Sequence, residues 1–350
     1  MTERDKIDKG FIPIYRTLFE HYKQGILTQK FLPSSKIDSI TEIQQQFQVS
    51  RETAKQVLKK LAEAGLIVQK PGKGSFVADL GPCHKTWGVI VPFFSAQTEE
   101  LIHFLKCEAD KNGRQLEYFI DYNNWEEEVR LVGTLINARY EAVLIIPTFD
   151  ESKTSPFYQS LFAGGTTIVF LNHTMRYTSF PSAIQSYDLG IKRGMHYLLS
   201  HGEGCLAFVK NHLAQGRNML QEVMESTFHG FIKRDEATCQ AVIIDDISQL
   251  TRAVIEERRI NGFFCCDDAE AVRVMGRLAD WGLKVPQEIR LVSYGNTELA
   301  RYFTPAITAI DPHYEQMAAL AATIVGQGQN QTTDKNQQYV LQPELIIRST

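Results

Sequence analysis

The chain contains 350 residues, 43% of them hydrophobic and 22% charged, with a formal net charge of −4 at pH 7. This length allows two or three domains, and the composition excludes a fibrous or largely disordered protein. The polar N-terminus lacks the apolar core of a secretory signal, and the longest apolar runs are strand-sized, so we expect a cytoplasmic protein without membrane contact. The six cysteines show neither zinc-ligand nor disulfide-framework spacing, which is typical of a reduced protein without a structural metal.

Charge is distributed unevenly along the chain. Residues 1–80 hold 13 basic and 9 acidic side chains, whereas the remaining 270 residues hold 24 and 32. The N-terminal part therefore carries a net charge of +4 and the rest −8. A cationic head on an acidic body favours nucleic-acid binding by the head, because contacts to phosphate supply most of the non-specific affinity.

The N-terminal part begins with three short helices. The spacing of apolar residues predicts them over residues 15–26, 39–47 and 50–61. In the third helix Arg51, Lys55 and Lys59 share a face that differs from the apolar face, and Ser50 is placed to cap the N-terminus. The tight connection between the second and third helices predicts a helix-turn-helix. By itself, a basic helix face is usually only a solvated face.

A β-hairpin is predicted directly after these helices. Gly65 is suited to end the third helix, and residues 66–68 alternate as a strand. Residues 71–74, Pro-Gly-Lys-Gly, predict a turn before a return strand at 75–77. Lys73 would lie at the tip of this hairpin, where it could reach a phosphate or the minor groove. The hairpin is therefore interpreted as the wing of a winged helix.

The order of these parts resembles the GntR family of winged-helix regulators over about residues 11–78. The matching residues are Pro13, Tyr15, Ile26, Pro33, Ser39, Val49, Ser50, Arg51, Thr53, Lys55, Leu58, Leu61, Gly65, Leu66, Ile67 and Gly72 to Val77. The family commonly has an acidic residue where this chain has Ile40, so no role is transferred to that position. The resemblance implies DNA contacts from Ser50, Arg51, Thr53, Lys55, Lys73 and Gly74.

The chemistry of these side chains divides their expected roles. Arg51 is the best candidate for reading bases, because its planar guanidinium group can bond a guanine edge bidentately. Lys55 and Lys73 are expected to contact phosphates, which position a protein without specifying a sequence. Thr53 is expected to touch a thymine methyl group or a phosphate. The competing interpretation is a solvated helix followed by an ordinary hairpin.

After a short polar linker at residues 80–86, strand and helix patterns alternate to the end of the chain. Strands are expected at residues 87–94, 115–120, 142–147, 167–171, 205–209, 241–244, 262–266 and 289–293, and within 339–347. Helices are expected at residues 101–112, 125–137, 187–200, 222–234, 249–258, 268–281 and 312–325. This alternation predicts parallel sheets covered by helices on both faces, and the number of strands predicts two α/β lobes.

Residues 87–350 resemble the effector-binding body of LacI-type repressors, whose fold is shared with periplasmic sugar-binding proteins. The matching segments are 87–94, 167–172, 187–190, 198–202, 262–268 and 305–310. The resemblance implies crossings between the lobes near Asp188, near Ala309 and at about residue 335. Lobe 1 would comprise about residues 87–188 and 310–335, and lobe 2 about residues 189–309 and 336–350. The expected fold class is α/β, with a winged helix-turn-helix at residues 1–79 and a two-lobed periplasmic-binding-protein-like domain at residues 87–350.

In this fold the ligand lies between the lobes, at the carboxyl ends of the strands. The candidate effector contacts are Phe93, Phe94, Thr148, Asn172, His173, Asp188, Asp267, Asp268 and Asn296. The two phenylalanines could stack on a sugar ring, but they could equally belong to the core. Asp268 could instead cap a helix, and His173 could lie in a surface loop.

Two positions depart from the LacI-type pattern. Many members carry an arginine where this chain has Thr227, and an aspartate where it has Gly295. In the family these residues often hold sugar hydroxyls. Arg217 lies nearby in the sequence and could replace the missing arginine.

A GntR-type head on a LacI-type body is the build of the arabinose repressors. It implies a homodimer that binds double-stranded operator DNA and is released by a monosaccharide or sugar phosphate. A regulator with a non-sugar or vestigial effector site is the first alternative, and the attached head disfavours a plain sugar-binding protein. An enzyme and a resident cofactor are disfavoured because the chain lacks Gly-x-Gly-x-x-Gly, P-loop and Gly-x-Ser-x-Gly motifs.

Overall fold

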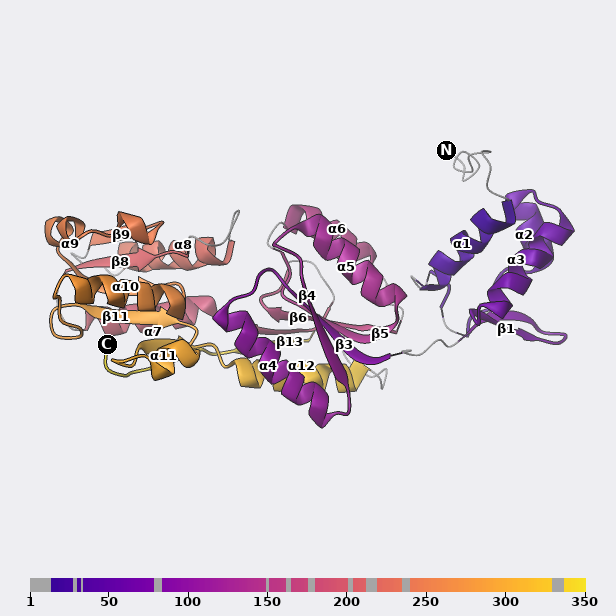
Figure 1. Cartoon of the computed structure of the whole chain (residues 1–350). Helices are drawn as coiled ribbons and strands as arrows, with labels where there is room; N and C mark the ends of the chain where they lie inside the picture. The colour runs from indigo at the N-terminus through magenta and orange to yellow at the C-terminus, as the bar shows by residue number, and fades with distance from the viewer. Residues whose placement is uncertain are drawn as a thin grey trace.

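A small N-terminal head and two α/β lobes make up the computed structural model (Figure 1). The structure describes residues 14–27, 30–32, 34–78, 84–148, 151–161, 165–175, 180–200, 204–211, 219–234, 240–328 and 337–350. Pro13, Pro33, Arg217 and the linker residues 79–83 lie outside these ranges. Residues 84–86 of the expected linker already belong to the first strand of lobe 1.

The head contains the expected helices and hairpin. Its elements are α1 (Ile14–Leu27), α2 (Ile40–Phe47), α3 (Arg51–Glu63), β1 (Ile67–Lys70) and β2 (Gly74–Val77). Ser39 and Glu42 form a reciprocal capping box that starts α2, and Gln48 ends it in the left-handed region at φ 52°. Ser50 then caps α3. Local capping chemistry therefore sets the short turn between the two helices.

The core of the head is one apolar cluster that includes Leu18, Ile43, Val57 and Leu61. Burial of these side chains supplies most of the stability of so small a unit. Tyr22 is also fully buried, and its hydroxyl donates to Asp38 Oδ2 at 2.7 Å. This hydrogen bond ties α1 to the segment before α2.

Lobe 1 is built on a six-stranded sheet in which all paired strands are parallel, in the order β13-β7-β6-β5-β3-β4. The strands are β3 (His84–Val91), β4 (Gln115–Ile120), β5 (Tyr140–Ile145), β6 (Thr167–Asn172), β7 (Ser182–Gln185) and β13 (Gln338–Leu341). The helices are α4 (Ala96–Lys111), α5 (Trp125–Asn137), α6 (Glu151–Ser160) and α12 (Tyr314–Gly328). Helices α4 and α12 cover one face of the sheet, and α5 and α6 cover the other (Figure 1).

Lobe 2 repeats this layering on a second six-stranded sheet, in the order β14-β12-β11-β10-β8-β9. The strands are β8 (Cys205–Val209), β9 (Gln240–Ile244), β10 (Ile260–Cys265), β11 (Arg290–Tyr294), β12 (Thr308–Asp311) and β14 (Glu344–Ile346). The helices are α7 (Tyr187–Leu199), α8 (Met219–Arg234), α9 (Arg252–Arg258), α10 (Asp268–Asp280) and α11 (Glu298–Tyr302), with a 3-10 turn at Ile247–Gln249. Helices α7 and α8 pack on one face, and α9, α10 and α11 on the other.

The third crossing between the lobes differs from the prediction. Strand β13 pairs with β7 of lobe 1, whereas β14 pairs antiparallel with β12 of lobe 2. The chain therefore crosses at residues 342–343 and not at about residue 335. The sequence predicts one final strand within residues 339–347, but Pro343 lacks the N–H that a continuous ladder needs, so the stretch divides between two sheets.

Three short elements were not predicted from the sequence. Helix α6 is polar and contains Pro156, β7 has only four residues, and α11 has five. Helix α6 is too polar, and β7 and α11 are too short, to show a clear apolar period. Their positions are set by packing against neighbours that are distant in sequence.

Candidate functional site

Helix α3 presents one buried face and one exposed face. Ala54, Val57, Leu58 and Leu61 are buried in the core of the head. Arg51 and Lys55 are exposed one turn apart, and within the described residues neither forms an ion pair. Lys59 and Lys60 both lie near Glu63, with Nζ–Oε distances of 3.8 and 2.8 Å. Arg51 and Lys55 are therefore the basic side chains of α3 that have no acidic partner among the described residues.

The N-terminus of α3 is organised by two hydroxyl side chains. Ser50 Oγ accepts from Thr53 N at 3.1 Å and lies 2.8 Å from Thr53 Oγ1. Ser50 is exposed and Thr53 half-buried. Their first role is to cap the helix, and contact with DNA stays a prediction for both.

The wing is a two-stranded hairpin in which Lys70 pairs with Gly74. The backbone N–H of Lys73 donates to Lys70 O at 3.0 Å and closes the turn, and the Lys73 side chain is exposed. Gly74 has a φ of +111°, a conformation that side chains rarely adopt. A Cβ there would also lie 3.0 Å from Lys36 Cε. Gly74 therefore has a structural role in the turn whether or not it contacts DNA.

Lys36 was not predicted from the sequence as part of the DNA-binding surface of the head. Its backbone bridges Phe76 of the wing, and its side chain is exposed beside Gly74. No local motif marks this residue, because it joins the wing through a contact that spans forty positions in the chain. Its charge adds to that of Lys73 at the turn of the wing.

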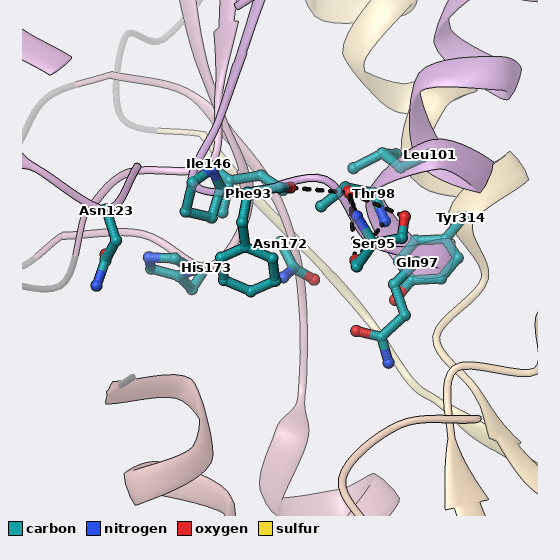
Figure 2. Close-up of a pocket in the computed structure, with 11 residues that line it drawn as sticks. Phe93, Ser95, Gln97, Thr98, Leu101, Asn123, Ile146, Asn172, His173 and Tyr314 are labelled. Atoms are coloured by element: carbon teal, nitrogen blue, oxygen red, sulfur yellow. Dashed lines mark hydrogen bonds between the residues drawn. The ribbon is translucent and has the colours of Figure 1, made fainter. Parts of the chain in front are cut away.

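One pocket of the body, with a cavity volume of about 30 Å³, lies at the carboxyl ends of the lobe 1 strands (Figure 2). The residues that line it are Pro92, Phe93, Ser95, Gln97, Thr98, Leu101, Asn123, Ile146, Asn172, His173 and Tyr314. Figure 2 shows Asn123 and His173 at one end of the view, Gln97 and Tyr314 at the other, and the Phe93 ring between them. Aromatic rings, amides and hydroxyls dominate this lining, and no charged side chain belongs to the described part of it.

His173 is held as a neutral ring. Its Nε2 lies 2.8 Å from Pro147 O, and because a carbonyl oxygen can only accept, the proton is assigned to Nε2. Burial lowers the pKa of His173 to about 4. In the neutral ring Nδ1 is then an acceptor, so His173 contributes no positive charge to the pocket at pH 7.

A buried acidic group supports the loop that carries Asn123. Asp121 is fully buried, and its Oδ1 accepts from Asn123 N at 2.8 Å, while Tyr122 and Asn123 adopt left-handed φ values of 57° and 54°. Burial and the nearby Glu128 carboxyl raise the pKa of Asp121 to about 8. Glu128 is itself buried with a pKa of about 7, and it accepts from Tyr158 OH at 2.7 Å.

Side chains also bridge the two lobes beside the pocket. Gln97 Nε2 donates to Tyr294 O at 2.6 Å, and Arg301 Nη2 donates to Glu100 Oε1 at 2.8 Å. The Arg301–Glu100 ion pair lies in a more open groove between α4 and α11. Phe94 lines this outer groove and not the pocket, with 54% of its surface exposed.

Three of the candidates from lobe 2, at positions 267, 268 and 296, are engaged in hydrogen bonds within that lobe. Asp267 caps α10, accepting from Glu270 N at 2.8 Å, and its Oδ2 accepts from Asn211 Nδ2 at 2.6 Å. Asp268 is buried, which raises its pKa, and accepts from the Ser293 hydroxyl and from Thr297 N. Asn296 Nδ2 donates to Asp311 Oδ2 at 2.9 Å, and Asn296 Oδ1 accepts from the Arg348 guanidinium group.

The structure thus brings together only part of the predicted effector set. Phe93, Asn172 and His173 line the pocket. Thr148 is buried outside the lining, where its N–H donates to the Glu128 carboxylate, and the exposed Asp188 pairs with Lys192 at 2.6 Å. The lining residues missed by the sequence interpretation include Ser95, Gln97, Thr98, Asn123 and Tyr314. Ser95 and Asn123 carried a usable signal, because each lies just after a predicted strand.

The described residues contain neither a metal-binding cluster nor a membrane-spanning helix. No group of three or more His, Cys, Asp or Glu side chains there is arranged to hold a metal ion. In the same residues, no helix combines the length and apolarity needed to cross a membrane.

Comparison with known families matches both parts of the chain. Residues 14–77 match the bacterial regulatory proteins of the GntR family, and residues 196–350 match the periplasmic binding protein-like domain. The arabinose metabolism transcriptional repressor of Halalkalibacterium halodurans is 24% identical over 372 aligned residues, which cover 95% of each chain.

Solved structures resemble the body at low sequence identity. A lac repressor dimer bound to operator and the anti-inducer ONPF has a TM-score of 0.65 and 18% identity, covering 76% of this chain and 94% of that one. A LacI-type regulator from Alkaliphilus metalliredigens complexed with D-xylulofuranose has a TM-score of 0.59 and 16% identity, covering 76% and 98%. At this identity the likeness establishes the fold and not the ligand.

Proposed function

We propose that this chain, which joins a GntR-family DNA-binding head to a periplasmic binding protein-like body, is a transcriptional repressor controlled by a small neutral sugar. This build belongs to regulators and not to enzymes. The protein would act in the cytoplasm, where its DNA target lies. The observation that supports the regulatory function best is the combination of an exposed basic α3 and wing with an uncharged pocket at the strand ends.

The DNA-binding half rests on the geometry of the head. Helix α3 presents Arg51 and Lys55 away from the core, and the wing presents Lys73. A helix of this kind fits the major groove, with a wing lysine on the adjacent backbone. A homodimer would place two such heads on a roughly palindromic operator, because operator symmetry mirrors protein symmetry.

The sugar half rests on the chemistry of the pocket. Amides can donate to and accept from sugar hydroxyls, and the Phe93 ring can cover an apolar ring face. A sugar phosphate is usually held by Arg or Lys in addition to a helix N-terminus. The N-terminus of α4 lines the pocket at Ser95, Gln97 and Thr98, but no basic side chain belongs to the described lining. We therefore favour a neutral monosaccharide. The arabinose-metabolism relative and the D-xylulofuranose in a structural neighbour support a pentose.

Sugar binding between the lobes would change their relative angle and move the two heads out of register with the operator. Because binding linkage is reciprocal, operator DNA must weaken sugar binding by the same factor by which sugar weakens DNA binding. The decisive measurement is operator affinity, by fluorescence anisotropy, with and without L-arabinose, D-xylose, D-ribose, D-glucose and their phosphates. A neutral pentose should weaken operator binding, and its phosphate should not. No response to any sugar would favour a non-sugar or vestigial effector site.

Substitutions in the head test the DNA-binding half separately. Arg51→Ala should cost about 1–3 kcal/mol on the operator and relax discrimination at one base position. Lys73→Ala should weaken operator and random DNA alike, with a smaller salt dependence. Lys59→Ala is the matched control, because Lys59 is exposed but lies near Glu63. If Arg51→Ala kept full operator preference, α3 would not be the reading helix.

A further inference from the structure

A buried chain of polar groups joins lobe 2 to the effector pocket. Tyr294, at the end of β11 in lobe 2, donates its hydroxyl proton to Gln185 Oε1 at 2.6 Å. Gln185, at the end of β7 in lobe 1, donates from Nε2 to Asn172 Oδ1. Asn172 lines the pocket. The exposed fractions of Tyr294, Gln185 and Asn172 are only 2%, 5% and 7%, so water does not compete for these bonds.

The direction of donation is the same along the whole chain. Because Gln185 Oε1 receives the Tyr294 proton, the amide nitrogen must face Asn172, which then offers its carbonyl oxygen. The Asn172 NH2 group is therefore turned away from Gln185. Gln185 Nε2 also donates to Tyr187 OH at 3.1 Å. The Asn172 NH2 group is then available to the pocket that Asn172 lines.

If Gln185 turned its amide over, Asn172 would have to turn as well. Its carbonyl oxygen would then take the place of the NH2 group, and an acceptor would replace a donor at the pocket. The orientation of one amide at the lobe boundary thus sets the polarity of a pocket residue.

Gln185 occupies the place where this coupling can follow lobe movement. It is separated by one residue from α7, at the first crossing between the lobes. The rings of Tyr187 and Tyr294 stack there, with centroids 5.5 Å apart. A Cβ at Gly190 would lie 3.0 Å from the Tyr294 hydroxyl oxygen, so this glycine leaves room for the hydroxyl.

Tyr294 is also held from the pocket side. Gln97, which lines the pocket, donates to the backbone carbonyl of Tyr294 at 2.6 Å. A change in the angle between the lobes moves Tyr294 relative to both Gln97 and Gln185. The same movement would therefore release the amides of Gln97 and Gln185. Gln97 faces the effector itself, and Gln185 holds Asn172, which faces the effector.

We infer that Gln185 is a positioning residue that couples the angle between the lobes to the donor polarity of Asn172 in the effector pocket. This inference rests on the proposed function, because it assumes that a small molecule binds between the lobes. It adds that the effector offers an acceptor oxygen to the Asn172 NH2 group. It also adds that the hydroxyl of Tyr294 transmits the state of the pocket to lobe 2.

Two variants separate the two ends of the chain. Tyr294→Phe keeps the stacked ring and removes only the donor, so it should reduce the coupling between sugar and operator. The ratio of operator affinities without and with saturating sugar should fall about three- to tenfold, as expected for one lost hydrogen bond. Gln185→Glu can still accept from Tyr294 but cannot donate to Asn172. The Asn172 NH2 group must then turn toward position 185, and its carbonyl oxygen must turn toward the pocket. Its affinity for the sugar should fall about tenfold or more.

The readouts are sugar affinity by isothermal titration calorimetry and operator affinity by fluorescence anisotropy, with the full chain and the sugar that releases the wild type. Tyr302→Phe is the matched control, because Tyr302 is a 77% exposed tyrosine of lobe 2. A purely structural role would lower the melting temperature but leave both the sugar affinity and the coupling ratio of the folded protein unchanged.

The possible outcomes are distinguishable. Wild-type values for both quantities in both variants would overturn the role of Gln185 while leaving the proposed function intact. If Gln185→Glu did not fold, Tyr294→Phe alone would decide, through the coupling ratio. If the wild type bound none of the sugars, the proposed function would fail and this inference would fail with it.

Discussion

The two sides of the cleft use polar residues at strand ends in different ways. In lobe 1, Asn172, His173 and Asn123 line the pocket. In lobe 2, each carboxylate oxygen of Asp267 and Asp268 accepts a hydrogen bond from within the lobe. A polar residue at a strand end is therefore a candidate ligand only when nearby backbone donors leave it available.

The difference arises from the element that succeeds each strand. In lobe 2, α10 begins immediately after Asp267, and the free N–H groups of its first turn attract the carboxylate. In lobe 1 the caps are supplied by other residues, Ser95 for α4 and Asn124 for α5. Asn123 can then turn toward the pocket. After β6 no helix begins at once, and Asn172 adopts a left-handed φ of 69°.

The largest expected effect is on lobe 2. Asp268→Ala would leave Ser293 and the Thr297 N–H without their buried acceptor, and should lower the free energy of unfolding by about 2–3 kcal/mol. Urea denaturation measures this change, and Asp268→Asn, which keeps one acceptor oxygen, should lose less. Sugar affinity of the folded protein should stay near the wild-type value. Loss of sugar affinity without loss of stability would make Asp268 a ligand contact and break the comparison.

A paired substitution tests lobe 1. Phe93→Ala removes a ring from the pocket and should weaken sugar binding about tenfold, which corresponds to a lost aromatic contact of about 1.5 kcal/mol. Phe94→Ala removes the neighbouring ring from the outer groove and should change the affinity less than about twofold. Isothermal titration calorimetry compares both variants. Equal losses would mean that the outer groove also belongs to the effector site.

The pH dependence of stability should distinguish two buried groups of lobe 1. The pKa of Asp121 is raised to about 8, so the folded state keeps a proton that the unfolded state releases near pH 4. Its contribution to stability is present below pH 4 and is lost as the pH rises through 8. The melting temperature of Asp121→Asn relative to that of the wild type should therefore rise between pH 5 and pH 9. An advantage of the variant at pH 5 only would contradict the buried neutral carboxyl.

His173 should make the protein less stable as the pH falls, which is opposite to the effect of Asp121. Burial lowers the pKa of His173 to about 4. Between about pH 6.5 and 4 the unfolded state therefore binds a proton that the folded state does not bind. Its contribution to stability is present above pH 6.5 and is lost as the pH falls toward 4. The melting temperature of His173→Gln should therefore decline less between pH 7 and pH 4.5 than that of the wild type. Parallel declines would argue against a neutral buried ring.

The smallest effect is expected at Asp188. Its side chain is 61% exposed and pairs with Lys192 within α7. An exposed ion pair of this kind contributes about 0–1 kcal/mol, so Asp188→Asn should leave stability and sugar affinity almost unchanged. Calorimetric titration with the same sugar provides the check. A large loss of affinity would return Asp188 to the effector site and weaken the distinction between the two lobes.

The head could be predicted from the sequence in most of its detail. Ser39 and Ser50 mark the starts of α2 and α3, Gly65 lies just past the end of α3, and the Pro-Gly-Lys-Gly turn marks the wing. These signals are local, because caps and turns depend on residues within a few positions. Lys36 escaped prediction because its place beside Gly74 depends on a contact between distant segments.

For the body, the order of residues along the chain was enough to establish the alternation of strands and helices and therefore the two-lobed α/β class, since apolar periodicity is a property of neighbouring residues. Three-dimensional packing was needed to decide that β13 pairs with a strand of lobe 1, that Asp268 is hydrogen-bonded within lobe 2 and that Tyr294 donates to Gln185. These outcomes depend on which groups compete for each hydrogen bond. The partners are separated by tens to hundreds of residues, so no local pattern records the result.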